Sequence, residues 1–273
     1  MANWKAKPNN GKLWLNASLE IQILLACNFE CHACDQFSNF HGISWVKKAT
    51  MTMAQIHHFI GEVQAANAFF GRIRLVGGEP SLHPRFHEIV RLLHEELLLR
   101  GHIVQLEIVT NGSHPEKIQP VKHLLKVRVS DNNDKNKHHI ANMRWTPHEL
   151  GYEGKTCRSP WHCGWSLNYY GFFPCSAGAG VAKLRDWMVE WQRLELPTGG
   201  VYETWPELQK LCNFCPYGLR DEHKVKCGID QYDKNVPSQE VWSQLAPWLN
   251  NKQPDWQVYG QPSAITAVEP AVA

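Results

Sequence analysis

The sequence predicts an α/β protein, a partial (β/α) barrel followed by a small cysteine-rich region. Up to about residue 130, short apolar stretches typical of buried strands alternate with stretches of helical period. This alternation predicts a parallel sheet with right-handed crossovers. Motifs with chemical potential come directly after the expected strands, at the edge where β/α proteins place their sites. From Cys157 onward the chain is instead rich in Cys, Trp, Gly and Pro.

The individual elements follow from local patterns. Residues 18–26 alternate and then become fully apolar, as expected for a strand buried in a parallel sheet. Thr52 and Gln55 have the spacing of a capping box, and apolar residues at helical spacing continue to Ala66. Further strands are expected at 72–76, 102–110 and 126–130, and helices from Pro84 to Leu97 and at 115–125.

The expected organisation has four parts. An N-terminal arm (residues 1–17) precedes the barrel core (18–153). The cysteine-rich region (154–230) contains a predicted hairpin at 166–175, turning near Gly171, and helical stretches at 181–192 and 203–211. The last segment (231–273) ends in a loosely held tail (252–273) that is rich in Pro, Gly and Ala.

Composition limits the function classes. The chain has 273 residues, 43% of them hydrophobic, which is enough for a substantial core. Lys plus Arg number 28 against 26 for Asp plus Glu, so no net field favours nucleic acid. The start is polar and no apolar stretch approaches the ~20 residues of a membrane span. Nine cysteines without a secretion signal indicate metal binding in a reducing compartment. We expect a soluble, cytoplasmic protein.

The chain is organised around a cluster of three cysteines after the first expected strand, Cys27, Cys31 and Cys34. Thiolates so close together can cover one face of a small metal centre, as in Fe–S proteins. A zinc ribbon more often supplies four ligands as two separated pairs. Three ligands leave one corner of the metal centre open for a substrate or cofactor. The run Gly77-Gly78-Glu79-Pro80 then follows the second expected strand.

This CxxxCxxC spacing, followed by a GGE-type motif, resembles the radical S-adenosylmethionine (radical SAM) superfamily over residues 18–230. The resemblance implies that Cys27, Cys31 and Cys34 hold a 4Fe–4S cluster whose fourth iron binds S-adenosylmethionine. It also implies reductive cleavage to methionine and a 5′-deoxyadenosyl radical that abstracts hydrogen from a substrate. An electron donor such as flavodoxin or ferredoxin is then a partner.

The resemblance extends to residues that contact S-adenosylmethionine. The two glycines let the backbone approach a ligand closely. Glu79 would accept hydrogen bonds from the ammonium group of the methionine moiety. Ala33 stands where the family usually has an aromatic residue near the adenine, a departure that puts the adenine pocket in doubt. Ser130 resembles a nucleoside-contacting serine, whereas Asn111 either lines the pocket or forms a turn. The expected contacts are Ala33, Gly77, Gly78, Glu79, Asn111 and Ser130.

The later cysteines resemble the SPASM and twitch extensions of radical SAM enzymes, which hold auxiliary 4Fe–4S clusters. Six thiols suit one such cluster, and the twitch spacing fits four of them best. Cys163 or Cys227 is an alternate for one of the four. A structural zinc site that includes Cys227 is the competing interpretation. The favoured ligands are Cys157, Cys175, Cys212 and Cys215.

The expected activity is hydrogen abstraction from a small sugar- or nucleotide-like molecule, in an oxidation assisted by the auxiliary cluster. The cysteine layout is similar to that of aminocyclitol dehydrogenases. A peptide-modifying maturase is the first alternative, although such enzymes often carry a leader-binding domain and two auxiliary clusters. An epimerase-like activity also remains open. A non-catalytic scaffold binding zinc or iron is the other class, and metal content separates it from the enzymes.

Overall fold

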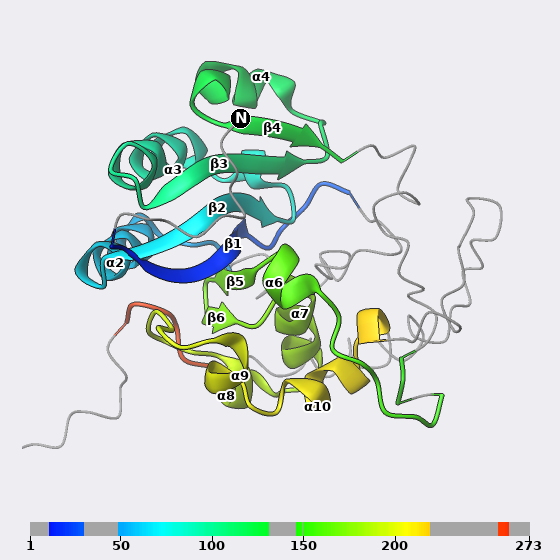
Figure 1. Ribbon diagram of the computed structural model, residues 1–273. Helices are drawn as coiled ribbons and strands as arrows, with labels where there is room; N and C mark the ends of the chain where they lie inside the picture. The colour runs from blue at the N-terminus through cyan, green and yellow to red at the C-terminus, as the bar shows by residue number, and fades with distance from the viewer. Residues whose placement is uncertain (1–10, 30–48, 131–145, 149, 219–255, 262–273) are drawn as a thin grey trace, which may run out of the picture.

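The computed structural model describes residues 11–29, 49–130, 146–148, 150–218 and 256–261. Its centre is a six-stranded sheet with the order β4-β3-β2-β1-β5-β6 (Figure 1). All neighbouring strands are parallel except β5 and β6, which form an antiparallel hairpin. The predicted α/β fold with a mostly parallel sheet is therefore confirmed. The strands are β1 (Leu13–Leu24), β2 (Ala68–Gly77), β3 (Ile103–Thr110), β4 (Lys126–Val129), β5 (Trp165–Asn168) and β6 (Gly171–Phe173).

The first strand starts earlier than expected. Leu13 already pairs with Ala68, and its backbone N–H donates to Asn67 O at 2.9 Å. The assignment of residues 13–17 to an arm is therefore wrong. The polar Asn16 interrupts the apolar pattern, so the sequence did not indicate a strand here. Its side chain is buried because it donates to the carbonyl of Pro160 at 2.8 Å.

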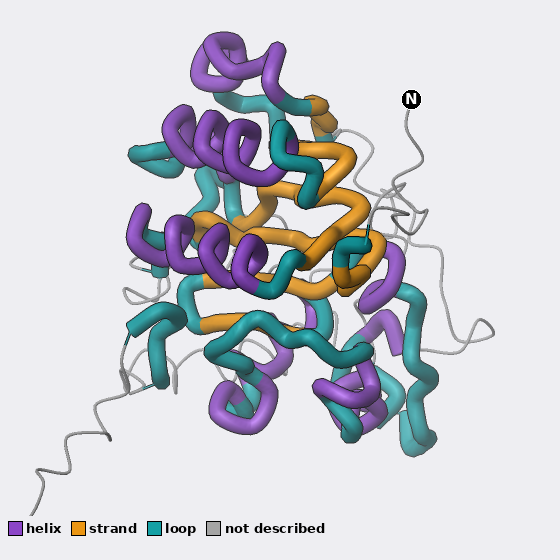
Figure 2. The backbone as a smooth tube through the Cα atoms, turned by 60° about the vertical axis from the view of Figure 1, so that its left-hand side comes forward, coloured by secondary structure: helices purple, strands orange, loops and turns teal. Residues whose placement is uncertain are grey.

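Helices α2 (Met53–Ala65) and α3 (Phe86–Leu93) lie side by side across one face of the sheet (Figure 2). The predicted capping box starts α2, since Thr52 Oγ1 accepts from Gln55 N and Gln55 Oε1 accepts from Thr52 N. Successive side chains of each strand point to opposite faces of the sheet. The apolar ones lie on the face that these helices cover. The remaining elements here are η1 (Pro80–Leu82), η2 (His94–Leu98), α4 (Pro115–Ile118) and η3 (Gln119–Leu124).

The chain after β4 does not continue the barrel at that edge. It returns to the opposite side of β1, where β5 pairs in parallel with Leu19–Ile21. The hairpin expected at 166–175 is confirmed and completes the same sheet as the core. The stretch 181–192 is not one helix, because Asp186 (φ 58°) separates its two parts. The elements here are α6 (Ser159–His162), α7 (Ser176–Leu184), α8 (Met188–Trp191), α9 (Val201–Thr204), α10 (Leu208–Asn213) and η5 (Pro216–Gly218).

Part of the expected tail is anchored. Trp256 and Tyr259 are buried, and Gln55 Nε2 donates to the carbonyls of Tyr169 and Tyr259, both at 2.9 Å. The assignment of these residues to a loose tail is therefore wrong. Aromatic packing explains this, since the Tyr259 ring lies 5.4 Å from that of Phe172. Residues 262–273 lie outside the described part of the chain.

His83, which follows η1, links the segment after the Gly77-Gly78-Glu79-Pro80 motif to the loop before α2. Its Nε2 donates to Met51 O at 2.9 Å, while Nδ1 accepts from Arg85 N at 3.0 Å. The side chain is buried, and burial lowers the pKa of His83. The neutral imidazole is thus the form that this environment holds.

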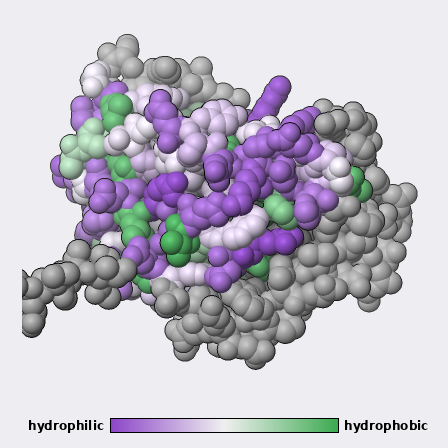
Figure 3. Space-filling view, turned by 90° about the horizontal axis from the view of Figure 1, so that it is seen from below, coloured by the Kyte–Doolittle hydropathy of each residue, from purple (hydrophilic) through white to green (hydrophobic). Residues whose placement is uncertain are grey.

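The described surface is mixed in character. Seen from below, small apolar spots lie among polar residues (Figure 3). Within the described residues, no helix is both long enough and apolar enough to cross a membrane.

Candidate metal and cofactor site

Cys27 follows β1 at the carboxyl edge of the sheet. Its Sγ accepts from Phe29 N at 3.4 Å and from Asn111 Nδ2 at 3.7 Å. Hydrogen bonds to sulfur stabilise a thiolate and tune the metal that it binds. The other members of the predicted site in this loop, Cys31, Ala33 and Cys34, lie outside the described residues.

Gly77 and Gly78 let the backbone that leads to Cys27 pack directly against β2. A Cβ on Gly78 would lie 1.9 Å from Ala26 O, and one on Gly77 would lie 2.1 Å from Leu24 O. Two backbone bonds hold the contact, Gly78 N to Leu24 O at 2.8 Å and Glu79 N to Ala26 O at 3.0 Å. Gly77 also has a φ of +136°, which L side chains rarely adopt. The glycines thus position the backbone that leads into Cys27.

Glu79 is fully buried and joins the ends of β2 and β3. Its Oε1 accepts from Ser81 N, Ser81 Oγ and Thr110 Oγ1 at 3.1, 2.5 and 2.8 Å. Its Oε2 accepts from Asn111 N at 2.7 Å. The carboxylate therefore fixes the loop at Asn111, whose side chain reaches Cys27.

Asn111 forms the turn considered from the sequence, and its side chain also contacts Cys27. Its Oδ1 accepts from Ser113 N at 2.9 Å and so forms a turn, while Nδ2 reaches Cys27 Sγ. Ser130 lies one strand farther along the same edge, with its N–H donating to Thr110 O at 2.7 Å. The loops after β1, β2, β3 and β4 therefore meet in a continuous chain of hydrogen bonds.

A row of buried charged residues crosses the other face of the sheet. The strand register places Glu20, Arg74 and Glu107 side by side on β1, β2 and β3. Arg74 donates to Glu20 Oε1 at 2.8 Å and to Glu107 Oε1 at 3.1 Å. Burial alone would lower the pKa of Arg74, but the two carboxylates outweigh it and the pKa is raised. Beside the row, burial and the charge of Arg74 lower the pKa of Arg72 to about 10.

We did not predict this row from the sequence, although a signal was present. Arg72 and Arg74 alternate with apolar residues in a stretch read as a buried strand, as do Ser18 and Glu20. Such alternation indicates a sheet with one polar face. Because only the apolar positions were used to assign the strands, their polar partners were overlooked.

Four of the later cysteines form one group beneath this polar face. Burial raises the pKa of Cys175, Cys212 and Cys215, and the charge of Cys157 raises it further in each. Clustered thiols that resist ionisation in the free protein suit a metal centre, because a bound cation offsets their mutual repulsion. The group combines segments that are far apart in the sequence, including the hairpin and the CxxC motif.

Two sulfurs of this group accept a hydrogen bond from a backbone N–H. Gly178 N donates to Cys175 at 3.2 Å, and Ser159 N to Cys157 at 3.4 Å. The backbone of Cys157 lowers the pKa of Cys212, and the backbones of Tyr217 and Gly218 lower that of Cys215, which partly offsets the effect of burial. Cys175 is also the N-cap of α7, where the helix dipole favours negative charge. The chemistry of this donor set fits an iron–sulfur cluster, whose potential depends on such hydrogen bonds.

Cys163 has different neighbours. Its charge acts on Arg72 and Arg74. Cys227, the other alternate, lies outside the described residues. No three His, Cys, Asp or Glu side chains of the described part converge around a single ion. On a single zinc with Zn–S bonds of about 2.3 Å, the four sulfurs would lie about 3.8 Å from one another. A cubane binds each sulfur to a different iron, so its ligands lie farther apart.

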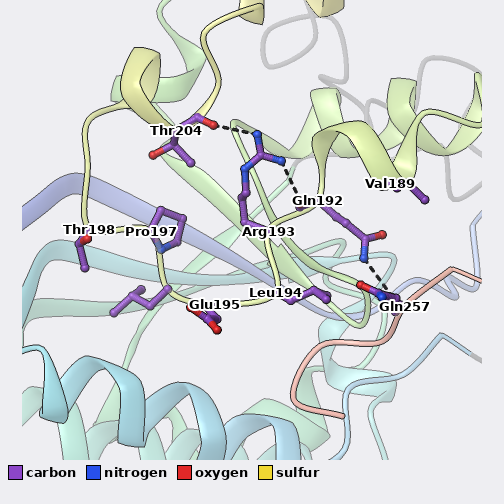
Figure 4. A pocket seen from close by; sticks show the side chains of 10 residues that line it. Val189, Gln192, Arg193, Leu194, Glu195, Pro197, Thr198, Thr204 and Gln257 are labelled. Carbon is purple, nitrogen blue, oxygen red and sulfur yellow. Dashed lines mark hydrogen bonds between the residues drawn. The ribbon is translucent and has the colours of Figure 1, made fainter. Parts of the chain in front are cut away.

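A surface groove of about 450 Å³ lies elsewhere, along residues 192–198 after α8. Arg193 crosses it and donates to the carbonyls of Glu190, Gln192 and Thr204, at 2.8–2.9 Å (Figure 4). The guanidinium therefore braces the surrounding loops. None of the predicted site residues lines this groove.

Comparisons with known proteins agree with the geometry. Residues 21–131 match the family model described as the Radical SAM superfamily. A curated relative, an S-adenosylmethionine-dependent nucleotide dehydratase from Fibrobacter sp. (strain UWH6), is 27% identical over 103 residues. That alignment covers 37% of this chain and 28% of the relative, so the chain spans little more than a quarter of that protein's length.

Two solved structures are similar in outline. BtrN in an open conformation gives a TM-score of 0.44 at 18% identity, covering 80% of this chain and 98% of BtrN. BtrN in complex with AdoMet and 2-DOIA gives 0.45 at 16% identity, covering 81% and 94%. The similarity is carried instead by the matched segment, which contains Cys27, the glycine motif and Asn111 at the ends of β1, β2 and β3. Over residues 21–131 the chain is therefore similar to the radical SAM superfamily.

Proposed function

We propose that this protein is a radical SAM enzyme with its primary cluster at the carboxyl edge of β1. The observation that carries the proposal is the bonded convergence of the loops after β1, β2 and β3 on Cys27. Cys27, Cys31 and Cys34 would hold a 4Fe–4S cluster. The cofactor contacts would come from Ala33, Gly77, Gly78, Glu79, Asn111 and Ser130.

The bound cluster supplies one electron for cleavage of S-adenosylmethionine to methionine and a 5′-deoxyadenosyl radical, which takes hydrogen from the substrate. The protein's own residues hold and orient the reactants. Oε2 of Glu79 accepts from one described donor, Asn111 N, so this oxygen retains capacity for the cofactor's ammonium group. Gly77 and Gly78 keep the approach free of side chains.

We further propose an auxiliary 4Fe–4S cluster on Cys157, Cys175, Cys212 and Cys215. The mutual electrostatic influence of these thiols and the backbone N–H groups that donate to Cys157 and Cys175 support it. Cys163, whose charge acts on Arg72 and Arg74, stays an alternate ligand.

The proposed substrate is a small nucleotide- or sugar-like molecule. The similarity to a nucleotide dehydratase favours nucleotides as the first class to test. Because that match spans only part of both chains, sugars belong in the same screen. Peptides serve as the test of the maturase alternative.

The experiment begins with anaerobic reconstitution and metal analysis. Two clusters predict about eight irons and eight sulfides per chain, whereas colourless protein containing only zinc would support the scaffold alternative. Reduced protein is then given S-adenosylmethionine, and 5′-deoxyadenosine is quantified. Deuterium transfer from labelled nucleotides, sugars and peptides into 5′-deoxyadenosine identifies the substrate class.

Variants assign the activity to the first cluster. Cys31→Ala should abolish 5′-deoxyadenosine formation while the second centre stays loaded, because the two cysteine groups are separate. Cys163→Ala is the matched control and should keep both the activity and the iron. Unchanged 5′-deoxyadenosine formation by Cys31→Ala would refute the proposal.

A further inference from the structure

Ser176 links the second cysteine group to the sheet. It is the first residue of α7, directly after Cys175, and its Oγ donates to Glu20 Oε2 at 2.6 Å. The two residues are 156 positions apart in the sequence. Because Cys175 Sγ accepts from Gly178 N, the segment is fixed both by the start of its own helix and by β1.

Glu20 is itself held rigidly. Its Oε1 accepts from Arg74, which also binds Glu107, so the row forms a continuous brace from β3 to α7. Glu20 and Arg74 are each 7% exposed, Ser176 is 4% exposed and Glu107 is 2% exposed. Charged hydrogen bonds in such a setting are stronger and less screened than on the surface.

We propose that Ser176 and Glu20 are positioning residues for the second centre, fixing Cys175 and placing a buried carboxylate beside it. This inference rests on the proposed function, since it requires the four cysteines to bind an iron–sulfur cluster. Net charge and hydrogen bonding near a cluster set its reduction potential. A buried negative charge disfavours an added electron, so Glu20 should keep the potential low.

The first test measures the reduction potential of the second centre in a Cys31→Ala background, where the primary cluster is absent. Glu20→Gln keeps the side-chain shape but removes the charge, so a shift to more positive potential is expected with iron content unchanged. Glu62→Gln is the matched control, because this carboxylate lies on α2 across the sheet and accepts from Tyr259. Its potential should equal that of the background protein.

The second test needs no metal. In the apoprotein, Ser176→Ala should increase the alkylation rate of Cys175 several-fold, and Ser176→Thr, which keeps the hydroxyl, should restore it. Cys27 provides the internal reference and should react at the same rate in all variants. This test also keeps the inference falsifiable if Glu20→Gln does not fold.

Specific results would overturn the inference. An unchanged potential in Glu20→Gln, or an equal shift in Glu62→Gln, would show that the Glu20 charge does not act on the centre. Wild-type alkylation of Cys175 in Ser176→Ala would show that the hydroxyl does not position it. Iron bound at the first centre alone would refute the proposed second cluster and, with it, this inference. The proposal of the primary activity would be unaffected.

Discussion

Replacing Gly78 by alanine should displace the backbone that carries Cys27. The added Cβ would lie 1.9 Å from Ala26 O and 2.7 Å from Cys27 N. Real Cβ contacts essentially never fall below 3.0 Å, so the two backbones must separate by at least 1.1 Å, the difference between these values. Both close neighbours are backbone atoms, and no flexible side chain can move aside.

The energetic cost follows from the bonds beside this contact. Gly78 N to Leu24 O and Glu79 N to Ala26 O both lengthen when the strands separate. Each contributes about 0.5–1.5 kcal/mol, and more if its groups stay buried without partners, so the loss is about 2–4 kcal/mol. For a chain of this size that lowers the melting temperature by roughly 5–15 °C.

Two measurements check this expectation, thermal unfolding of the apoprotein and iron content after anaerobic reconstitution. Gly78→Ala should unfold at lower temperature and lose about half of the iron, because only the first centre is disturbed. Gly61→Ala is the control, since Gly61 lies within α2 and nothing is within 4 Å of its added Cβ. The control should gain about 0.5–1 kcal/mol. A Gly78→Ala protein with the wild-type melting temperature and full iron would refute the reasoning.

Three further changes test other parts of the structure. Cys175→Ala should remove about half of the iron, whereas Cys163→Ala should remove none, and equal losses would contradict the ligand assignment. Glu79→Gln places an amide opposite N–H and O–H donors, so it should cost about 1–3 kcal/mol in thermal unfolding; a wild-type melting curve would contradict this. Because burial lowers the pKa of His83 below 6.5, the unfolded chain binds the proton first, and stability should fall as pH decreases from 6.5. His83→Gln should flatten this dependence and the exposed His57→Gln should not, as melting temperatures from pH 5 to 8 will show.

Periodicity and local motifs predicted the first half of the fold well, because those patterns reflect local physics. The capping box of Thr52 and Gln55 starts α2, and the apolar runs became β1 to β4. The return of β5 to the free edge of β1 was not predictable, since strand order depends on pairing between distant segments. The burial of Tyr259 was missed for the same reason, because its partners lie more than 80 residues away.

The sequence named the motif residues of the candidate site, but it did not indicate the contacts that they make. The spacing of the cysteines and the position of Gly77-Gly78-Glu79 identified the motif without showing what it contacts. In the structure the glycines allow the backbone after β1 to approach β2 closely, and Glu79 accepts a hydrogen bond from the turn at Asn111. These roles arise from pairs of segments about 50 and 30 residues apart, and a single motif does not encode its partner.

Strand direction determines how far apart the two cysteine groups lie. Glu20 and Phe173 both pair with Ser166, so the end of β6 and Cys175 lie near the level of Glu20. Cys27 lies beyond Leu24, which is about 13 Å farther along β1 at roughly 3.3 Å per residue. A parallel crossover would have delivered Cys175 to the same edge as Cys27. The antiparallel hairpin instead delivers it toward the opposite end, with the charged row of Glu20, Arg74 and Glu107 beside it. This arrangement leaves the polar face of the sheet between the two groups.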